Sequence, residues 1–98
     1  ARPSGSVLID QGACGALSRP DGSSLLPVGI TGVEGSFEAG DLVRVKGPDG
    51  REIARGIVNY SSGDVALIQG RHTREIVDVL GHVGHAEVIH RDNLVAGV

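Results

Sequence analysis

Four glycines punctuate the apolar stretch from Leu25 to Val45, LLPVGITGVEGSFEAGDLVRV, and glycines at this density can form a loop that cradles phosphate. The pattern GITGVEG is GxxGxxG, which is neither the GxGxxG of dinucleotide-binding folds nor the GxxxxGK[ST] of phosphate-binding loops. A phosphate loop must also lead into a helix N-terminus, whereas the next segments, EAGD and LVRV, are typical of a turn and a strand. The stretch therefore predicts strand bends and turns at its glycines, which are Gly29, Gly32, Gly35 and Gly40.

The histidines are the first candidates for metal ligands. Two of them are close in the motif HVGH, but a zinc site requires three or four protein ligands. No cysteine accompanies them, and the nearest carboxylate, Glu87, falls in a predicted strand. The pattern favours solvated loop histidines and predicts no metal site and no cofactor in this chain; the histidines are His72, His82, His85 and His90.

A hydrolytic nucleophile would need a general base beside it. Ser61 and Ser62 lie close to Asp64, but no GxSxG elbow is present, and SSGD is also a helix-start signature. Cys14 lies in a segment rich in glycine and alanine and is predicted to be a small packed side chain. We therefore predict no catalytic residue.

The basic residues could form a nucleic-acid surface. Arg44 and Lys46 share one face of a predicted strand, but acidic residues are interleaved with them and the formal net charge of the 98 residues is −3. Phe37 and Tyr60 are the only aromatic residues, so stacking of single-stranded bases has almost no platform. A solvated surface of mixed charge is favoured, and recognition of structured RNA through its backbone or shape stays open as the alternative.

Composition and length indicate one domain from a longer protein. A single cysteine excludes an intrachain disulfide and is typical of a reducing, cytoplasmic setting. No apolar run reaches the roughly 20 residues of a membrane helix, and no secretory leader is present. The chain contains no methionine, which suggests an excised piece. We predict a linker remnant over residues 1–6 and a domain over residues 7–98.

The first half of the chain is predicted to alternate short strands with one helix. VLID, residues 7–10, is typical of a buried strand, and Asp10 can cap a helix over residues 11–18. Pro27 favours an edge strand or a strand entry. A turn at EAGD and a strand at LVRVK follow.

A hairpin is predicted around GPDG. Proline in second place and then Asp-Gly favour a type I turn with Gly50 in the left-handed region, which gives a bulged hairpin. This register sets Lys46 opposite Glu52 and Val45 opposite Ile53. The alternative two-residue loop would set Lys46 opposite another cation, Arg51.

Two further short helices and one or two closing strands complete the predicted elements. Ser61 can start a helix that ends at Gly70, and Thr73 can cap a helix over REIVDVL with Gly81 after its end. AEVIH and LVAGV are the closing strands. Together, these strands and helices predict a mainly β fold: a small, mostly antiparallel barrel with short helices inserted.

Five segments carry a resemblance to a known family. VLIDQGACGAL, SLLPVGI, VEGSFEAGDLVRV, GREIARGIVNYSS and VIHRDNLV resemble, in this order and spacing, the C-terminal PUA domains of bacterial glutamate 5-kinases. The resemblance extends from Ser6 onward. It implies a PUA-like pseudo-barrel of mixed strands with two or three short helices.

The resemblance also implies a parent enzyme. Glutamate 5-kinases transfer phosphate from ATP to L-glutamate in the first step of proline biosynthesis. Their active site, with ATP, magnesium and feedback proline, belongs to an upstream amino-acid-kinase domain. The resemblance thus implies a catalytically silent, accessory or regulatory domain of a cytoplasmic transferase, a homo-oligomeric parent, the kinase domain as its partner, and no membrane partner.

In RNA-modifying relatives of the PUA family, the first helix, the loop after it and the second strand face RNA. On this chain the resemblance transfers that surface to residues 16–29, and residues 26–29 are where a ligand contact is expected. The implied RNA or partner surface consists of Arg19, Ser23, Ser24 and Gly29, with Arg44 and Lys46 on the predicted strand.

Overall fold

A five-stranded mixed sheet forms the centre of the molecule. The computed structural model describes residues 2–20, 22–82 and 84–96. The strand order is β2-β1-β3-β4-β5, in which β1 and β3 are parallel and every other pair is antiparallel. The mainly β fold predicted from the sequence is confirmed. The strands are β1 (Gly5–Ile9), β2 (Ile30–Gly35), β3 (Leu42–Lys46), β4 (Glu52–Ile57) and β5 (Leu94–Ala96).

The first strand begins two residues before the predicted start. β1 pairs with β2 from Gly5 onward, and Ser6 is buried although it falls in the range predicted as a linker. A Cβ at position 5 would lie 2.5 Å from the Glu34 carbonyl oxygen, so a glycine lets the two strands meet here. The domain boundary at residue 7 stays a prediction.

Local capping signals place the helices where the sequence predicts them. Asp10 Oδ1 accepts the Ala13 N–H at 2.8 Å, and Ser61 Oγ accepts the Asp64 N–H at 3.2 Å. Gly81 ends the third helix with φ 79°, in the left-handed region. The helices are α1 (Gln11–Leu17), α2 (Ser62–Ile68) and α3 (Ile76–Leu80), and the 3-10 turns are η1 (Pro27–Gly29), η2 (Thr73–Glu75) and η3 (Arg91–Asn93).

The predicted cap at Thr73 is wrong. The 3-10 turn that precedes α3 begins after His72, whose N–H donates to the Glu75 carboxylate at 3.0 Å. The Thr73 hydroxyl instead donates to the Ala86 carbonyl oxygen at 3.3 Å. A tertiary contact thus occupies the side chain that the local pattern assigned to capping.

The β3–β4 hairpin confirms one predicted pair and corrects the other. Gly50 adopts φ 82°, and Lys46 lies opposite Glu52 as predicted. Val45 lies opposite Ala54 and not opposite Ile53, because the register shifts between Val45 and Lys46. Ile53 is therefore the extra residue of a bulge, which lets Ala54 turn into the core.

The closing strands are shorter than predicted. In the segment AEVIH only Ile89 pairs, in an isolated bridge with Leu25, and β5 covers three residues of LVAGV. The rest of LVAGV, residues 97–98, lies outside the described part of the chain, as does Asp21 in the predicted turn RPDG. Pro27 opens η1 directly before the edge strand β2, which confirms its predicted role as a strand entry.

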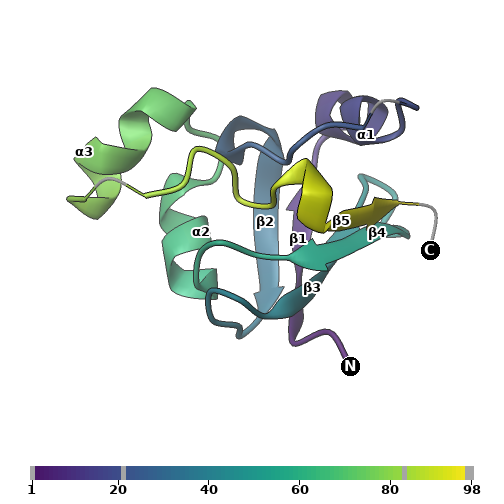
Figure 1. Cartoon of the computed structure of the whole chain (residues 1–98), viewed down its shortest axis with the longest axis horizontal. Helices are drawn as coiled ribbons and strands as arrows, with labels where there is room; N and C mark the ends of the chain where they lie inside the picture. The colour runs from purple at the N-terminus through teal and green to yellow at the C-terminus, as the bar shows by residue number, and fades with distance from the viewer. Residues whose placement is uncertain (1, 21, 83, 97–98) are drawn as a thin grey trace.

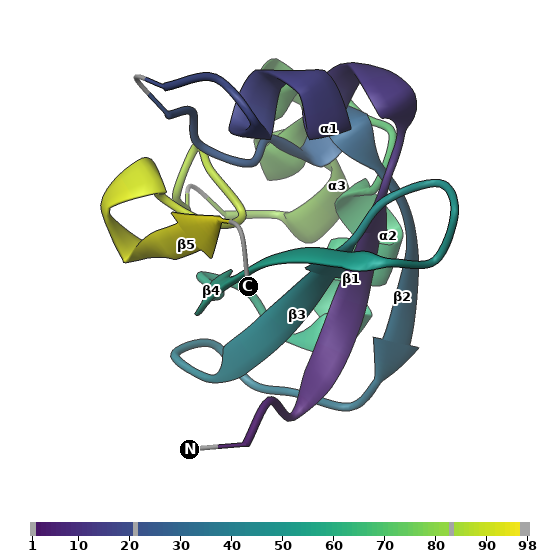
Figure 2. The same cartoon turned by 90° about the vertical axis from the view of Figure 1, so that its right-hand side faces the viewer.

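The three helices surround the core at different sides of the sheet. Figure 2 shows α1 across one end of the strands, while α2 contacts β2 and α3 packs against α2 (Figure 1). The buried core contains side chains from the strands, from α2 and from connecting segments. These include Val7, Val43, Phe37, Val65 and Ile89. Among the described residues, no helix has the length and apolar character that crossing a bilayer requires.

The packing at Gly56 yields a first prediction. A Cβ at this position would lie 2.7 Å from both the Asn93 carbonyl oxygen and the Ile89 Cγ2 atom. We expect Gly56→Ala to lower the free energy of unfolding by about 1–3 kcal/mol, because backbone and core must shift. Urea denaturation measures this change.

The matched control is Gly63→Ala in α2, where nothing lies within 4 Å of the added Cβ. This variant should be neutral or more stable by up to about 1 kcal/mol, since alanine favours helix. Equal stabilities of the two variants would contradict the packing described at Gly56.

Candidate functional site

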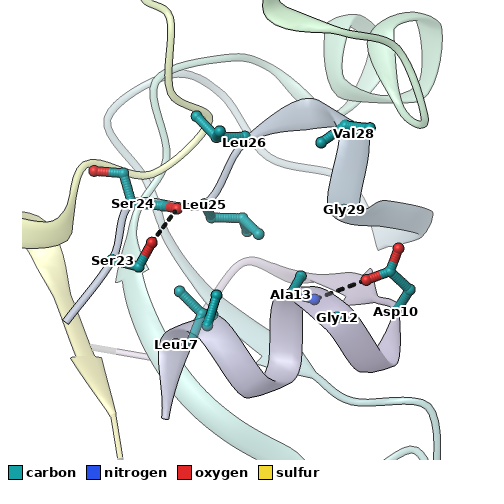
Figure 3. A pocket seen from close by; sticks show the side chains of 11 residues that line it. Asp10, Gly12, Ala13, Leu17, Ser23, Ser24, Leu25, Leu26, Val28 and Gly29 are labelled. Atoms are coloured by element: carbon teal, nitrogen blue, oxygen red, sulfur yellow. Dashed lines mark hydrogen bonds between the residues drawn. The ribbon is translucent and has the colours of Figure 1, made fainter. Parts of the chain in front are cut away.

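A pocket of about 310 Å³ lies between α1 and the chain that returns to β2 (Figure 3). Another hollow, of about 220 Å³, lies between α3 and residues 84–86. The first pocket overlaps the expected surface of residues 16–29 but also includes residues from the segment 10–13 of the chain. Its lining residues are Asp10, Gly12, Ala13, Ala16, Leu17, Ser23, Ser24, Leu25, Leu26, Val28 and Gly29.

One wall of the pocket is α1, which is held against the start of β2. The Asp10 N–H donates to the Gly29 carbonyl oxygen at 2.9 Å, while the Asp10 side chain caps the helix. A Cβ at position 29 would lie only 2.6 Å from the Ala13 Cβ. The lack of a side chain at Gly29 thus allows the close packing between helix and chain.

The opposite wall is anchored to the C-terminal part of the chain. The Leu25 N–H donates to the Ile89 carbonyl oxygen and the Val88 N–H donates to the Leu25 carbonyl oxygen, both at 2.8 Å. Ser24 Oγ accepts the Arg91 N–H at 2.9 Å. These bonds join residues 24–25 to residues 88–91, so this wall of the pocket depends on the C-terminal part of the fold.

The lining is mostly apolar with polar groups at its two ends. Figure 3 shows Leu25 directed into the middle, with Ser23 and Ser24 on one side and Asp10 on the other. Leu26 and Val28 are 41% and 45% exposed at the rim. Asp10 is the one charged side chain among the described lining residues, which include no lysine or arginine.

The structure separates the predicted surface into two groups. Ser23, Ser24 and Gly29 line the pocket together, and Arg19 follows α1 outside the lining. Arg44 and Lys46 lie on β3, on the sheet face that points away from the core. Whether any of these residues binds a ligand stays a prediction.

Carboxylates pair with the cations of that sheet face. Lys46 Nζ lies 2.9 Å from Glu34 Oε1, and Arg44 Nε lies 3.2 Å from Glu52 Oε1. Arg55 also forms an ion pair with Glu52. The hydrogen bond from Arg55, together with the charges of Arg55 and Arg44, holds the pKa of Glu52 below its ordinary value. The mixed, solvated surface predicted from the sequence is what these pairs form.

The other sequence candidates are exposed or have structural partners in the described part of the chain. Across residues 2–20, 22–82 and 84–96, no three His, Cys, Asp or Glu side chains are grouped as metal ligands would be. His72, His82 and His85 are exposed, and His90 accepts the Asp92 N–H through Nδ1. Ser61 is the cap of α2, and Cys14 is half-buried against the core.

Comparison with known families agrees with the fold. A family model described as the PUA domain matches residues 5–80. The chain belongs to the PUA domain family.

Curated relatives narrow the assignment: the chain is homologous to the C-terminal region of glutamate 5-kinases. It is 56% identical over 94 residues to glutamate 5-kinase of Trichlorobacter lovleyi, covering 96% of this chain and 25% of the relative. It is 53% identical over 95 residues to glutamate 5-kinase of Carboxydothermus hydrogenoformans, covering 97% of this chain and 25% of the relative. The chain therefore spans about a quarter of the length of these relatives.

Solved structures support the same fold. A PUA domain from Aeropyrum pernix, crystallised as a tartrate complex, matches with a TM-score of 0.65 and 26% identity over 90% of this chain and 41% of that chain. A conserved PUA domain protein from Thermoplasma acidophilum matches with a TM-score of 0.55 and 26% identity over 88% of this chain and 48% of that chain.

The sequence pattern predicts only a capping role for Asp10. Asp10 also lines the pocket, and this role depends on its hydrogen bond to Gly29 and on the path of the chain that returns to β2. Leu17 is likewise recognisable in the sequence as an inward helix residue but not as part of a pocket. The signal that does point here is the apolar LLPV directly before Gly29.

The ion pairs of Glu52 yield a second prediction. Because folding lowers the pKa of Glu52, the unfolded chain binds more protons near that pKa, and stability rises with pH. The contribution is fully present above the ordinary value of 4.5 and is lost as pH falls through the lower folded-state pKa. We therefore expect Glu52→Gln to destabilise the protein near neutral pH, and the difference from wild type to shrink below that value.

Urea denaturation at a series of pH values from about 3 to 7 measures this difference, with Glu38→Gln as the control at an exposed glutamate. A difference between Glu52→Gln and wild type that is independent of pH would contradict the pairing.

Proposed function

We propose that the chain is a non-catalytic accessory domain of a glutamate 5-kinase, which tunes the regulation or assembly of that enzyme. The observation that carries this proposal is the coverage of the relatives: kinases that are 53–56% identical to nearly the whole chain are four times its length. The parent enzyme would phosphorylate the side-chain carboxylate of L-glutamate with ATP. Its ATP and magnesium sites would lie in the remaining three quarters, in an upstream amino-acid-kinase domain.

The hydrogen bonds of the described residues support a non-catalytic role. The groups that sequence analysis weighed as nucleophiles have structural partners: Ser61 Oγ caps α2, and Ser62 Oγ accepts the Phe37 N–H at 3.2 Å. In the candidate pocket the Asp10 carboxylate caps α1, and the hydroxyls of Ser23 and Ser24 are hydrogen-bonded to the backbone.

Removal of this domain from the full-length parent tests the proposal. We expect ATP-dependent phosphorylation of L-glutamate to continue with turnover within about threefold of the intact enzyme, because the reacting groups lie elsewhere. Inhibition by proline or oligomeric state should change. Steady-state kinetics with and without proline, and light scattering, measure these effects.

Circular dichroism of the truncated enzyme is the control for a folded kinase domain. Loss of turnover in a truncated enzyme that is still folded would overturn the accessory role. A full-length parent that does not phosphorylate L-glutamate would overturn the proposed identity of the enzyme.

One observation favours a second candidate, the recognition of structured RNA. Ser23, Ser24 and Gly29, implied by the family resemblance to face RNA, line one pocket. This candidate ranks second, because Lys46 and Arg44 are already paired with carboxylates and RNA affinity depends on cations that neutralise phosphates.

If RNA binds, Arg19→Ala should weaken the complex more than Lys46→Ala, since Lys46 is engaged by Glu34. Mobility shifts of a structured RNA at low and high salt measure this. Unchanged RNA mobility with micromolar domain at low salt would exclude the second candidate.

A further inference from the structure

The pocket beside α1 combines an apolar middle with a single negative end. Asp10 lies at the end next to Gly29, and the side chains of Leu17 and Leu25 form the middle (Figure 3). Leu25 is 1% exposed and Leu17 is 5% exposed, so the apolar floor is fixed by the core. A ligand that fits must therefore be apolar along most of its length and compatible with a carboxylate at one end.

The Asp10 carboxylate has capacity for a ligand. Oδ1 accepts the Ala13 N–H at 2.8 Å, and among the described residues the carboxylate has no other hydrogen bond and no ion pair. An ionised carboxylate accepts about four hydrogen bonds through its two oxygens. Oδ2 is thus an available acceptor that carries charge at the pocket end.

Among the described residues, no cationic side chain lines either end of the pocket. The Arg91 N–H contacts Ser24, and Arg19 follows shortly after Leu17, which Figure 3 places on the serine side. Neither residue lines the pocket. The negative charge at Asp10 is consequently not neutralised within the site, in contrast to Glu34 and Glu52 on the sheet face.

We infer that this pocket binds a lysine side chain of a protein partner. The four-carbon stem would lie on the apolar floor and the ammonium group would meet Asp10 Oδ2, as amphipathic side chains do where apolar surface ends in a charge. Lysine fits better than arginine, because a two-pronged guanidinium pair uses both carboxylate oxygens, of which Oδ1 already accepts the Ala13 N–H, whereas an ammonium group can donate to Oδ2 alone. A volume of about 310 Å³ is at the small end for ligand pockets and suits a single side chain.

This inference rests on the pocket alone and does not depend on the proposed kinase parent. The charge also separates it from phosphate recognition, since an anion at this end would be repelled by Asp10. The test therefore compares three ligands of similar shape and different charge.

Titration of the isotopically labelled chain by NMR provides the test. The probes are N-acetyl-lysine methylamide, the uncharged norleucine analogue and the anionic glutamate analogue, each up to about 50 mM because ligands this small bind weakly. We expect the amide signals of Ala13, Ala16 and Leu25 to shift. The lysine probe should bind roughly two- to fivefold more tightly than norleucine, the range for an exposed ion pair, and glutamate should bind weakest. Added salt should reduce the lysine preference.

Two variants separate charge from shape. Asp10→Asn keeps an oxygen that caps α1 and removes the charge, so lysine and norleucine should then bind equally. Ala16→Leu keeps a good helix former and fills the pocket, so shifts from every probe should disappear. The inference is overturned if no probe shifts the pocket amides of wild type, if norleucine or glutamate binds as well as lysine, or if the lysine preference survives Asp10→Asn.

Discussion

The close approach of Asp10 and Gly29 is the contact on which the candidate site depends. The hydrogen bond from the Asp10 N–H to the Gly29 carbonyl oxygen holds the end of β1 against the start of β2, so the chain between them must form a closed excursion at one end of the sheet. The Asp10 carboxylate starts α1 inside that excursion. Because Ala13 and Ala16 are small, and because position 29 has no side chain, helix and returning chain approach closely yet leave a hollow between them.

The C-terminal segment completes the same unit. Leu25, in the floor of the pocket, exchanges backbone hydrogen bonds with Val88 and Ile89, both fully buried in the core. β5 then pairs with β4 as an edge strand of the sheet. The family pattern ends at residue 80, but the core and the pocket wall require the residues that follow. The folded unit is therefore larger than the family pattern, which is physically consistent with relatives that match nearly the whole chain.

The sequence predicts best the features whose causes lie within a few adjacent residues. The caps at Asp10 and Ser61 and the left-handed turn at Gly50 follow from local hydrogen bonds and backbone sterics, and the structure contains all three. Thr73 was assigned to a cap by the same local logic, but its hydroxyl bonds to a carbonyl thirteen residues away. The predicted pairing of Val45 with Ile53 is wrong for a related reason. Burial in the core decides which residue of β4 turns inward, and that residue is Ala54. Burial and long-range hydrogen bonds decide where local preferences conflict with packing.

The ion pairs of the sheet also depend on long-range structure that a local sequence pattern does not specify. The predicted register brings Lys46 opposite Glu52, and this is correct, but the Lys46 ammonium contacts Glu34 on β2, because β1 separates the two strands by only one position in the sheet. That contact follows from the strand order, which no local pattern specifies. This has a consequence for binding: Arg44 and Lys46, which look available in the sequence, are compensated in the fold, whereas the Asp10 carboxylate forms no ion pair among the described residues. Recognition of a polyanion requires uncompensated cations, so the pairs at Arg44 and Lys46, more than the net charge of −3, reduce what this sheet face offers to a nucleic acid.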